Sequence, residues 1–133
     1  MILLDTHAAI WFVTDDEAIG KISRAVALAA LDDGELAVSA ITFWEIALLV
    51  AKNRLGSLDS ATDLRRQVLD AGVTELPLTG DIALLAVELE DLHGDPADRF
   101  IAATAIAYDA TLMTADTRLL RWRHQLRRQN AAR

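Results

Sequence analysis

The chain has 133 residues, 53% of them apolar, with a formal net charge of −7 and no cysteine. This length fits one domain with a sizeable core, the apolar fraction argues against disorder, and the lack of cysteine excludes disulfides, thiolate metal sites and cysteine nucleophiles. No basic segment precedes the first apolar run, and no uncharged apolar stretch reaches the length of a membrane span. We therefore expect a cytoplasmic protein of one domain, residues 1–133, that does not enter a membrane.

Short apolar segments alternate with helical patterns along the chain. In chain order the predicted elements are strand 2–5, helices 6–13 and 21–32, strand 36–39, helices 41–53 and 60–71, strand 73–76, helices 80–92 and 97–110, strand 111–114 and helix 116–126. Ser60 and Gly72 suit the two ends of one helix, and Asp95 with Pro96 suits the start of another. This alternation predicts an α/β fold with a mostly parallel sheet covered on both faces.

The charge is divided unevenly along the chain. Residues 117–133 contain six arginines and no acidic residue, whereas residues 1–116 carry seven basic and twenty acidic groups, a net −13. We expect a basic C-terminal tail from about residue 121, which could approach a phosphate backbone that the rest of the surface repels. The alternative is a solvated tail that pairs with acidic surface. Trp122, between two arginines, is the aromatic residue whose setting suits nucleic acid.

Four carboxylates interrupt apolar segments: Asp5, Glu45, Asp98 and Asp116. Two of them follow predicted strands, and parallel sheets bind ligands beyond the carboxyl ends of their strands. An ionised carboxylate taken out of water needs a partner, a proton or a metal. Clustered acids also repel, by about 4 kcal/mol for a pair about 4 Å apart at an effective dielectric near 20. Oxygen ligands without cysteine favour a hard divalent cation, so the four residues predict one Mg²⁺ site.

Each carboxylate also has a structural interpretation. The residues three and four positions from Glu45 are uncharged, so the alternative is that Glu45 reaches solvent or pairs with a distant arginine. Asp98 could instead interact with the dipole of its helix, although Asp95 fills that role better as an N-cap. Asp5 and Asp116 could each be only an N-cap, so their assignment depends on convergence with the other two.

The histidines and most aromatic residues give weaker signals. His7, two residues after Asp5, could contact substrate or the surroundings of a metal, or could have a structural role at a helix end. His93 and His124 have the settings of loop and tail residues, and no histidine has zinc-site spacing. Trp11 and Trp44 alternate with apolar residues and are expected in the core.

Four segments, taken in order, resemble the acidic motifs of PIN-domain ribonucleases, and their spacing and the chain length resemble VapC-type toxins of toxin–antitoxin pairs. The segments are Asp5-Thr6-His7 after an apolar strand, 39–46, 95–105 and 112–116. The resemblance covers residues 1 to about 120. It implies a PIN-like three-layer α/β/α sandwich with a central, mostly parallel sheet of four to five strands. The segment after Leu120 lacks the apolar final strand that many relatives carry, so the sequence leaves open whether the sheet has four or five strands.

The same resemblance implies a function. It implies endonucleolytic cleavage of RNA that depends on Mg²⁺, for which Mn²⁺ can substitute. Asp5, Glu45 and Asp98 match the three core metal-binding acids, and Asp116 matches the fourth. Thr6 and Thr114 match small hydroxyl residues near the site. The implied partners are an RNA substrate, a second copy of the chain in a homodimer, and a cognate antitoxin that inserts a segment into the active-site groove and can form a hetero-oligomer with the toxin.

Two other functions remain open from the residues alone. One is an aspartate-nucleophile phosphatase or phospho-acceptor domain that uses Asp5. It fits poorly, because no second aspartate stands two positions after Asp5 and the only lysines, Lys21 and Lys52, do not follow a late strand. The other is a non-catalytic binding module in which the acids are structural and the protein grips a basic partner.

Overall fold

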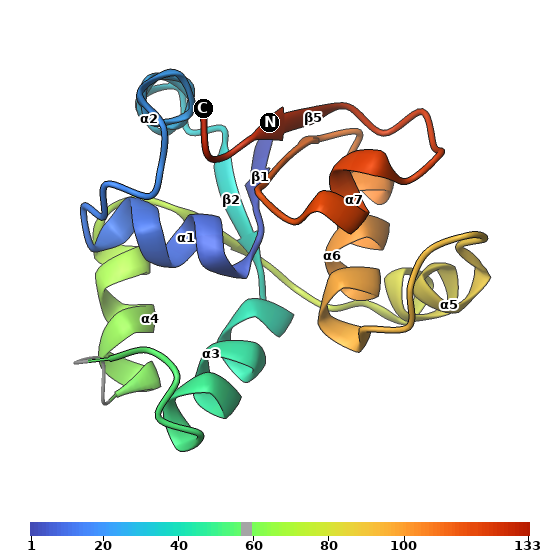
Figure 1. Ribbon diagram of the computed structural model, residues 1–133, viewed down its shortest axis with the longest axis horizontal. Coiled ribbons are helices and arrows are strands. Elements are labelled where there is room, and N and C mark those ends of the chain that lie inside the picture. Colours follow the sequence, from blue (N-terminus) through green and yellow to red (C-terminus); the bar gives the residue numbers. More distant parts are fainter. Residues whose placement is uncertain (57–59) are drawn as a thin grey trace.

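The computed structural model describes residues 1–56 and 60–133, whose strands form one all-parallel sheet (Figure 1). The strands are β1 (Ile2–Leu4), β2 (Leu36–Ser39), β3 (Thr74–Leu76), β4 (Thr111–Thr114) and β5 (Arg128–Asn130). The helices in these ranges are α1 (Thr6–Val13), α2 (Lys21–Asp32), α3 (Ile41–Ala51), α4 (Ala61–Asp70), α5 (Gly80–Glu88), α6 (Pro96–Ala107) and α7 (Thr117–Arg121). None of these helices is long and apolar enough to cross a membrane.

The strand order is β3-β2-β1-β4-β5, so the N-terminal strand lies in the centre of the sheet. The chain winds outwards from β1 in one direction through β2 and β3, and in the other through β4 and β5. A parallel sheet with such a reversal forms a crevice at the carboxyl ends of the two strands that flank it, here β1 and β4. The topology therefore marks one end of the central strand pair as the place for a site.

Helices cover both faces of the sheet, which is seen nearly edge-on in Figure 1. On one face Leu3, Ala37 and Leu112 pack with α5, α6 and α7. On the other face the neighbouring strand residues, including Leu4 and Met113, pack with α1, α2 and α4. Strands buried on both faces are expected to be apolar throughout, which is why these segments lack polar alternation. The predicted three-layer α/β/α sandwich is confirmed.

Most predicted elements occur where expected, but two predicted helices are shorter. The predicted helix 80–92 ends at Glu88, and the predicted helix 116–126 is only α7. The first stops early because the Arg99 guanidinium binds carbonyl groups in the last turn of α5 and in the loop that follows, at 2.7–3.2 Å. These carbonyls belong to Ala86, Val87, Leu89, Leu92 and His93. One half-buried arginine thus replaces helical hydrogen bonding across the α5–α6 connection.

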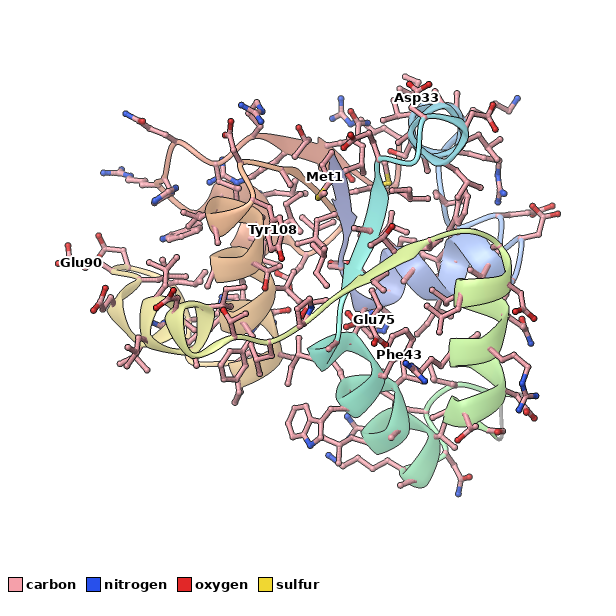
Figure 2. The ribbon with its side chains drawn as sticks, turned by 180° about the vertical axis from the view of Figure 1, so that it is seen from behind. Met1, Asp33, Phe43, Glu75, Glu90 and Tyr108 are labelled. Atoms are coloured by element: carbon pink, nitrogen blue, oxygen red, sulfur yellow. The ribbon has the colours of Figure 1, made fainter. Side chains whose placement is uncertain are left out.

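The C-terminal segment is part of the sheet. Arg128–Asn130 forms β5, which pairs with β4 through the backbone, and Ala131 is fully buried. Trp122 is only 5% exposed, and its indole N–H donates to the carbonyl oxygen of Glu90, labelled at the far end of the α5 region in Figure 2. The basic C-terminal segment is therefore not a separate tail over residues 128–131, and the expectation that Trp122 is available to nucleic acid is wrong.

Candidate active site

The four predicted carboxylates face one pocket of about 290 Å³. Asp5 directly follows β1 and Asp116 comes two residues after β4, at the crevice that the strand order creates. Glu45 lies on α3, and Asp98 lies in the first turn of α6. Segments that are far apart in the sequence therefore converge at the carboxyl end of the central strands.

Asp5 is the most constrained of the four. Its side chain is buried, with Oδ1 accepting a hydrogen bond from the amide of Ala8 at 2.9 Å and Oδ2 accepting one from the hydroxyl of Thr114. Burial raises the pKa of Asp5 to about 6, although both hydrogen bonds act in the opposite direction. Asp5 is thus both the N-cap of α1 and a carboxylate held at the pocket.

Asp98 is buried beside a histidine that was not among the predicted site residues. Its Oδ2 lies 2.7 Å from Nε2 of His93 and 3.5 Å from Nη2 of Arg118. Burial raises the pKa of Asp98, and repulsion by Asp95, Asp116 and Glu45 acts in the same direction, against the hydrogen bond from His93. From the sequence alone, His93 is expected in a loop. The one local feature that could have indicated a place at the site is its position five residues before Asp98.

Asp116 is held by Arg118. It caps α7 by accepting the backbone N–H of Arg118 at 2.8 Å, and its other oxygen lies 2.9 Å from the guanidinium Nη2 of the same residue. Burial alone would raise the pKa of Asp116, but the hydrogen bonds and charge of Arg118 outweigh it and lower the pKa. Asp5 and Asp116 therefore do cap α1 and α7, and both also line the pocket, so capping is not their only position in the structure.

Glu45 is half-buried and makes no ion pair or hydrogen bond with the residues that the structure describes. Pairing with a distant arginine, the alternative for this residue, is not observed within them. Arg65 of α4 holds the start of α3 in place, because its guanidinium lies 5.7 Å from the ring centre of Phe43 and binds Glu75 at 2.8 Å. Phe43 and Glu75 are labelled near one another in Figure 2.

The remaining predicted residues also line or support the pocket. Thr6 is buried at its wall, with its hydroxyl 3.5 Å from that of Thr42. His7 is exposed at the rim, with its ring centre 6.3 Å from that of Trp11. The Thr114 hydroxyl donates to Asp5 and accepts the Asp116 amide at 3.0 Å.

One prediction about the aromatic residues is wrong. Trp44, expected in the core, is 49% exposed on α3. The buried side chains of α3 are instead those of Thr42 and Ile46, two positions before and two positions after Trp44. Trp44 therefore contributes surface rather than core.

The donor set fits a divalent cation. Among the residues that the structure describes, five carboxylates and one arginine line the pocket. Single donor atoms of His93, Asp98 and Asp116 all lie within 4.8 Å of one another. Carboxylate oxygens are the ligands of hard cations, and a cation would offset the repulsion that raises the pKa of Asp98. The residues present therefore suit Mg²⁺ or a similar ion.

Comparison with known proteins agrees with the fold. Residues 2–124 match the PIN domain family. Ribonuclease VapC22 of Mycobacterium tuberculosis is 36% identical over 124 residues, which cover 92% of each protein. The solved structure of VapBC-1 from nontypeable Haemophilus influenzae matches over 100% of both chains, with a TM-score of 0.69 and 23% identity. VapBC2 from Rickettsia felis, solved bound to a DNA fragment from its promoter, covers 98% of both chains, with a TM-score of 0.68 and 21% identity. This chain belongs to the PIN-domain family.

Proposed function

We propose that this protein is a Mg²⁺-dependent endoribonuclease, the toxin of a toxin–antitoxin pair. The observation that carries the proposal is the convergence of Asp5, Glu45, Asp98 and Asp116 on one pocket of a PIN domain. The ribonuclease name of the curated relative supports RNA as the substrate. The fold alone would not, because one fold hosts many functions.

The four carboxylates would hold Mg²⁺, and Mn²⁺ can substitute because it accepts the same oxygen ligands. When bound, such a cation supplies Lewis-acid stabilisation of a scissile phosphate and a water of lowered pKa for in-line attack. The number of ions held depends on how the four side chains share their oxygens. Asp5 and Asp98 are the most buried of them and therefore the most rigid ligands.

The other roles in the reaction would belong to side chains of the protein itself. Asp98 would orient or deprotonate the attacking water, with its carboxylate oriented by the hydrogen bond to His93. Thr114 fixes the position of Asp5 and the entry of the chain into α7. Thr6 lies at the pocket wall and His7 at the rim, where they would contact the substrate.

The solved structures of similar fold support a protein partner for this chain. The solved relatives named above are VapBC assemblies, and a toxin–antitoxin complex from Klebsiella pneumoniae has a similar fold, with a TM-score of 0.58. We propose that a cognate antitoxin covers the pocket of this protein, that the chain forms a homodimer in such an assembly, and that it acts in the cytoplasm.

The structure disfavours a nucleophilic role for Asp5. Both of its oxygens already accept hydrogen bonds, from the Ala8 amide and the Thr114 hydroxyl. Neither Lys21 nor Lys52 lines the pocket, so no lysine is available there for a phosphoryl group. A phosphatase or phospho-acceptor activity therefore has no observation in its favour.

The experiment that tests the proposal incubates the purified, antitoxin-free protein with a panel of structured RNAs. We expect cleavage with Mg²⁺, none with a chelator, and a loss of at least about a hundredfold in Asp98→Asn. Asp109→Asn is the matched control, because Asp109 is exposed and has a positive φ of 50°, which asparagine tolerates. Absence of metal-dependent cleavage by the wild type across the panel would contradict the proposal.

A further inference from the structure

Arg118 bridges two of the four carboxylates. Its Nη2 lies 2.9 Å from Oδ2 of Asp116 and 3.5 Å from Oδ2 of Asp98, the oxygen that also meets His93. Arg118 is the one arginine that lines the pocket. A single guanidinium therefore partly neutralises the pair of acids contributed by α6 and the start of α7.

The guanidinium is not locked in this position. The Arg118 side chain is 56% exposed, and within the described ranges its side-chain partners are these two carboxylates. Its backbone N–H is bound by Oδ1 of Asp116, the same carboxylate that its guanidinium contacts. Arg99 makes a clear contrast, since five carbonyl oxygens hold its guanidinium in place. Arg118 can therefore move its charge without unfolding α7.

A cation held by the carboxylates would need oxygens that Arg118 now contacts. A divalent ion close to a guanidinium is repelled by it, and carboxylate lone pairs directed at the ion are no longer free to accept from the arginine. The two positive groups therefore compete for Asp98 and Asp116. Arginine also pairs well with phosphate, through two parallel N–H donors.

We propose that Arg118 is an exchangeable counter-ion of the active site. In the metal-free protein it bridges Asp98 and Asp116, and when a divalent cation takes these oxygens it turns to a backbone phosphate of the bound RNA. This inference rests on the proposed function and deepens it, because it names a substrate-binding residue and couples it to the metal. The exchange itself requires only that the carboxylates bind a divalent cation.

The test measures both ligands in the same set of variants: wild type, Arg118→Gln, Arg118→Lys and Arg121→Gln. Arg121 is the matched control, because it is an exposed arginine of the same helix that does not line the pocket. Calorimetric titration of the chelator-treated protein with Mn²⁺ gives the metal affinity. Cleavage of RNA at saturating Mn²⁺ gives kcat and KM.

Arg118→Gln should bind Mn²⁺ on the order of tenfold more tightly, because a competing charge is removed. The same variant should cleave RNA at least about tenfold less efficiently, chiefly through a raised KM, and Arg118→Lys should recover part of the loss. Arg121→Gln should bind Mn²⁺ within about twofold of wild type, because charges apart from the pocket are screened. If Arg118 had only a structural role, its replacement would not be expected to raise the Mn²⁺ affinity while lowering the efficiency of RNA cleavage.

Unchanged or weaker Mn²⁺ affinity in Arg118→Gln would overturn the exchange, as would equal tightening in Arg121→Gln. Tighter Mn²⁺ binding with undiminished cleavage would overturn the role at the substrate. A wild type that binds Mn²⁺ but cleaves no RNA would overturn the proposed function and the substrate half of the inference, while the Mn²⁺ affinities still decide the exchange. Thermal unfolding of each variant shows whether the fold is intact.

Discussion

The hydroxyl of Thr114 donates a hydrogen bond to Oδ2 of Asp5, joining two residues 109 positions apart in the sequence. The same hydroxyl accepts the amide of Asp116 at 3.0 Å. Thr114 is fully buried at the end of β4, next to the central strand β1. One small side chain therefore binds the carboxylate of Asp5 and the backbone of Asp116.

Replacing Thr114 by valine should destabilise the protein by about 2 kcal/mol, because it removes a donor to a buried carboxylate and an acceptor for an amide while the shape is kept. Cleavage should also fall, since Asp5 loses its orientation. Urea denaturation measures the first effect. Thr114→Ser keeps the hydroxyl and is the control. A valine variant as stable and as active as wild type would contradict this role.

Asp5 should make the stability of the metal-free protein depend on pH. Its pKa is about 6 in the folded protein against an ordinary value of 3.8, so the folded state binds the proton more tightly. Ionisation of Asp5 therefore opposes folding: the penalty is absent below about pH 4, develops as the pH rises to about 6, and amounts to about 3 kcal/mol above that.

Asp5→Asn removes that penalty. Relative to wild type, its free energy of unfolding should rise by about 3 kcal/mol between pH 4 and pH 7, measured by urea denaturation with a chelator present. Asp91→Asn, at an exposed position whose positive φ of 59° asparagine tolerates, should show no such trend. The prediction fails if the difference between Asp5→Asn and wild type is the same at both pH values.

Arg99→Lys should destabilise the protein by about 3 kcal/mol. A lysine ammonium cannot reach the several carbonyl oxygens that the planar guanidinium binds, and buried carbonyls are left unpaired. Chemical denaturation of this variant and of Arg66→Lys, an exposed pair on α4, gives the comparison. Similar small losses in both variants would show that the α5–α6 connection does not depend on Arg99.

Gly20→Ala should destabilise the attachment of the C-terminal segment. A Cβ at Gly20 would overlap the backbone of Arg133, whereas a Cβ at Gly80 would meet nothing within 4 Å. We expect a loss of about 1–3 kcal/mol and faster hydrogen exchange at the Ala131 amide, which donates to Thr114, with no loss in Gly80→Ala. Unchanged exchange in Gly20→Ala would mean that the two segments separate easily.

The sequence predicted the parts of the fold that depend on local apolar pattern. The strands 36–39 and 111–114 and the helices 6–13 and 21–32 have the expected bounds. Asp5 and Asp116 line one pocket because the carboxyl ends of the parallel strands β1 and β4 meet at one edge of the sheet, and Glu45 and Asp98 reach the same pocket from α3 and α6. Their roles as metal ligands stay a prediction.

Features that depend on tertiary contacts left little trace in the sequence. Strand β5 reads Arg-Gln-Asn, and it is a strand because the backbone of β4 pairs with it. Helix α5 stops at Glu88 because of Arg99, a residue eleven positions later. The position of His93 five residues before Asp98 is too weak a signal to show that its Nε2 meets Asp98. Tertiary structure overrides local propensity in each of these cases.

The central claim is that four carboxylates from four segments form one divalent-cation site. Anomalous diffraction from crystals of the protein soaked in Mn²⁺ tests it most directly, with Asp98→Asn crystals treated in the same way as the control. We expect a strong peak in the pocket bounded by Asp5, Glu45, Asp98 and Asp116, weakened or absent in the variant. A soaked wild-type crystal with no peak in that pocket, or an equal peak in Asp98→Asn, would contradict the account.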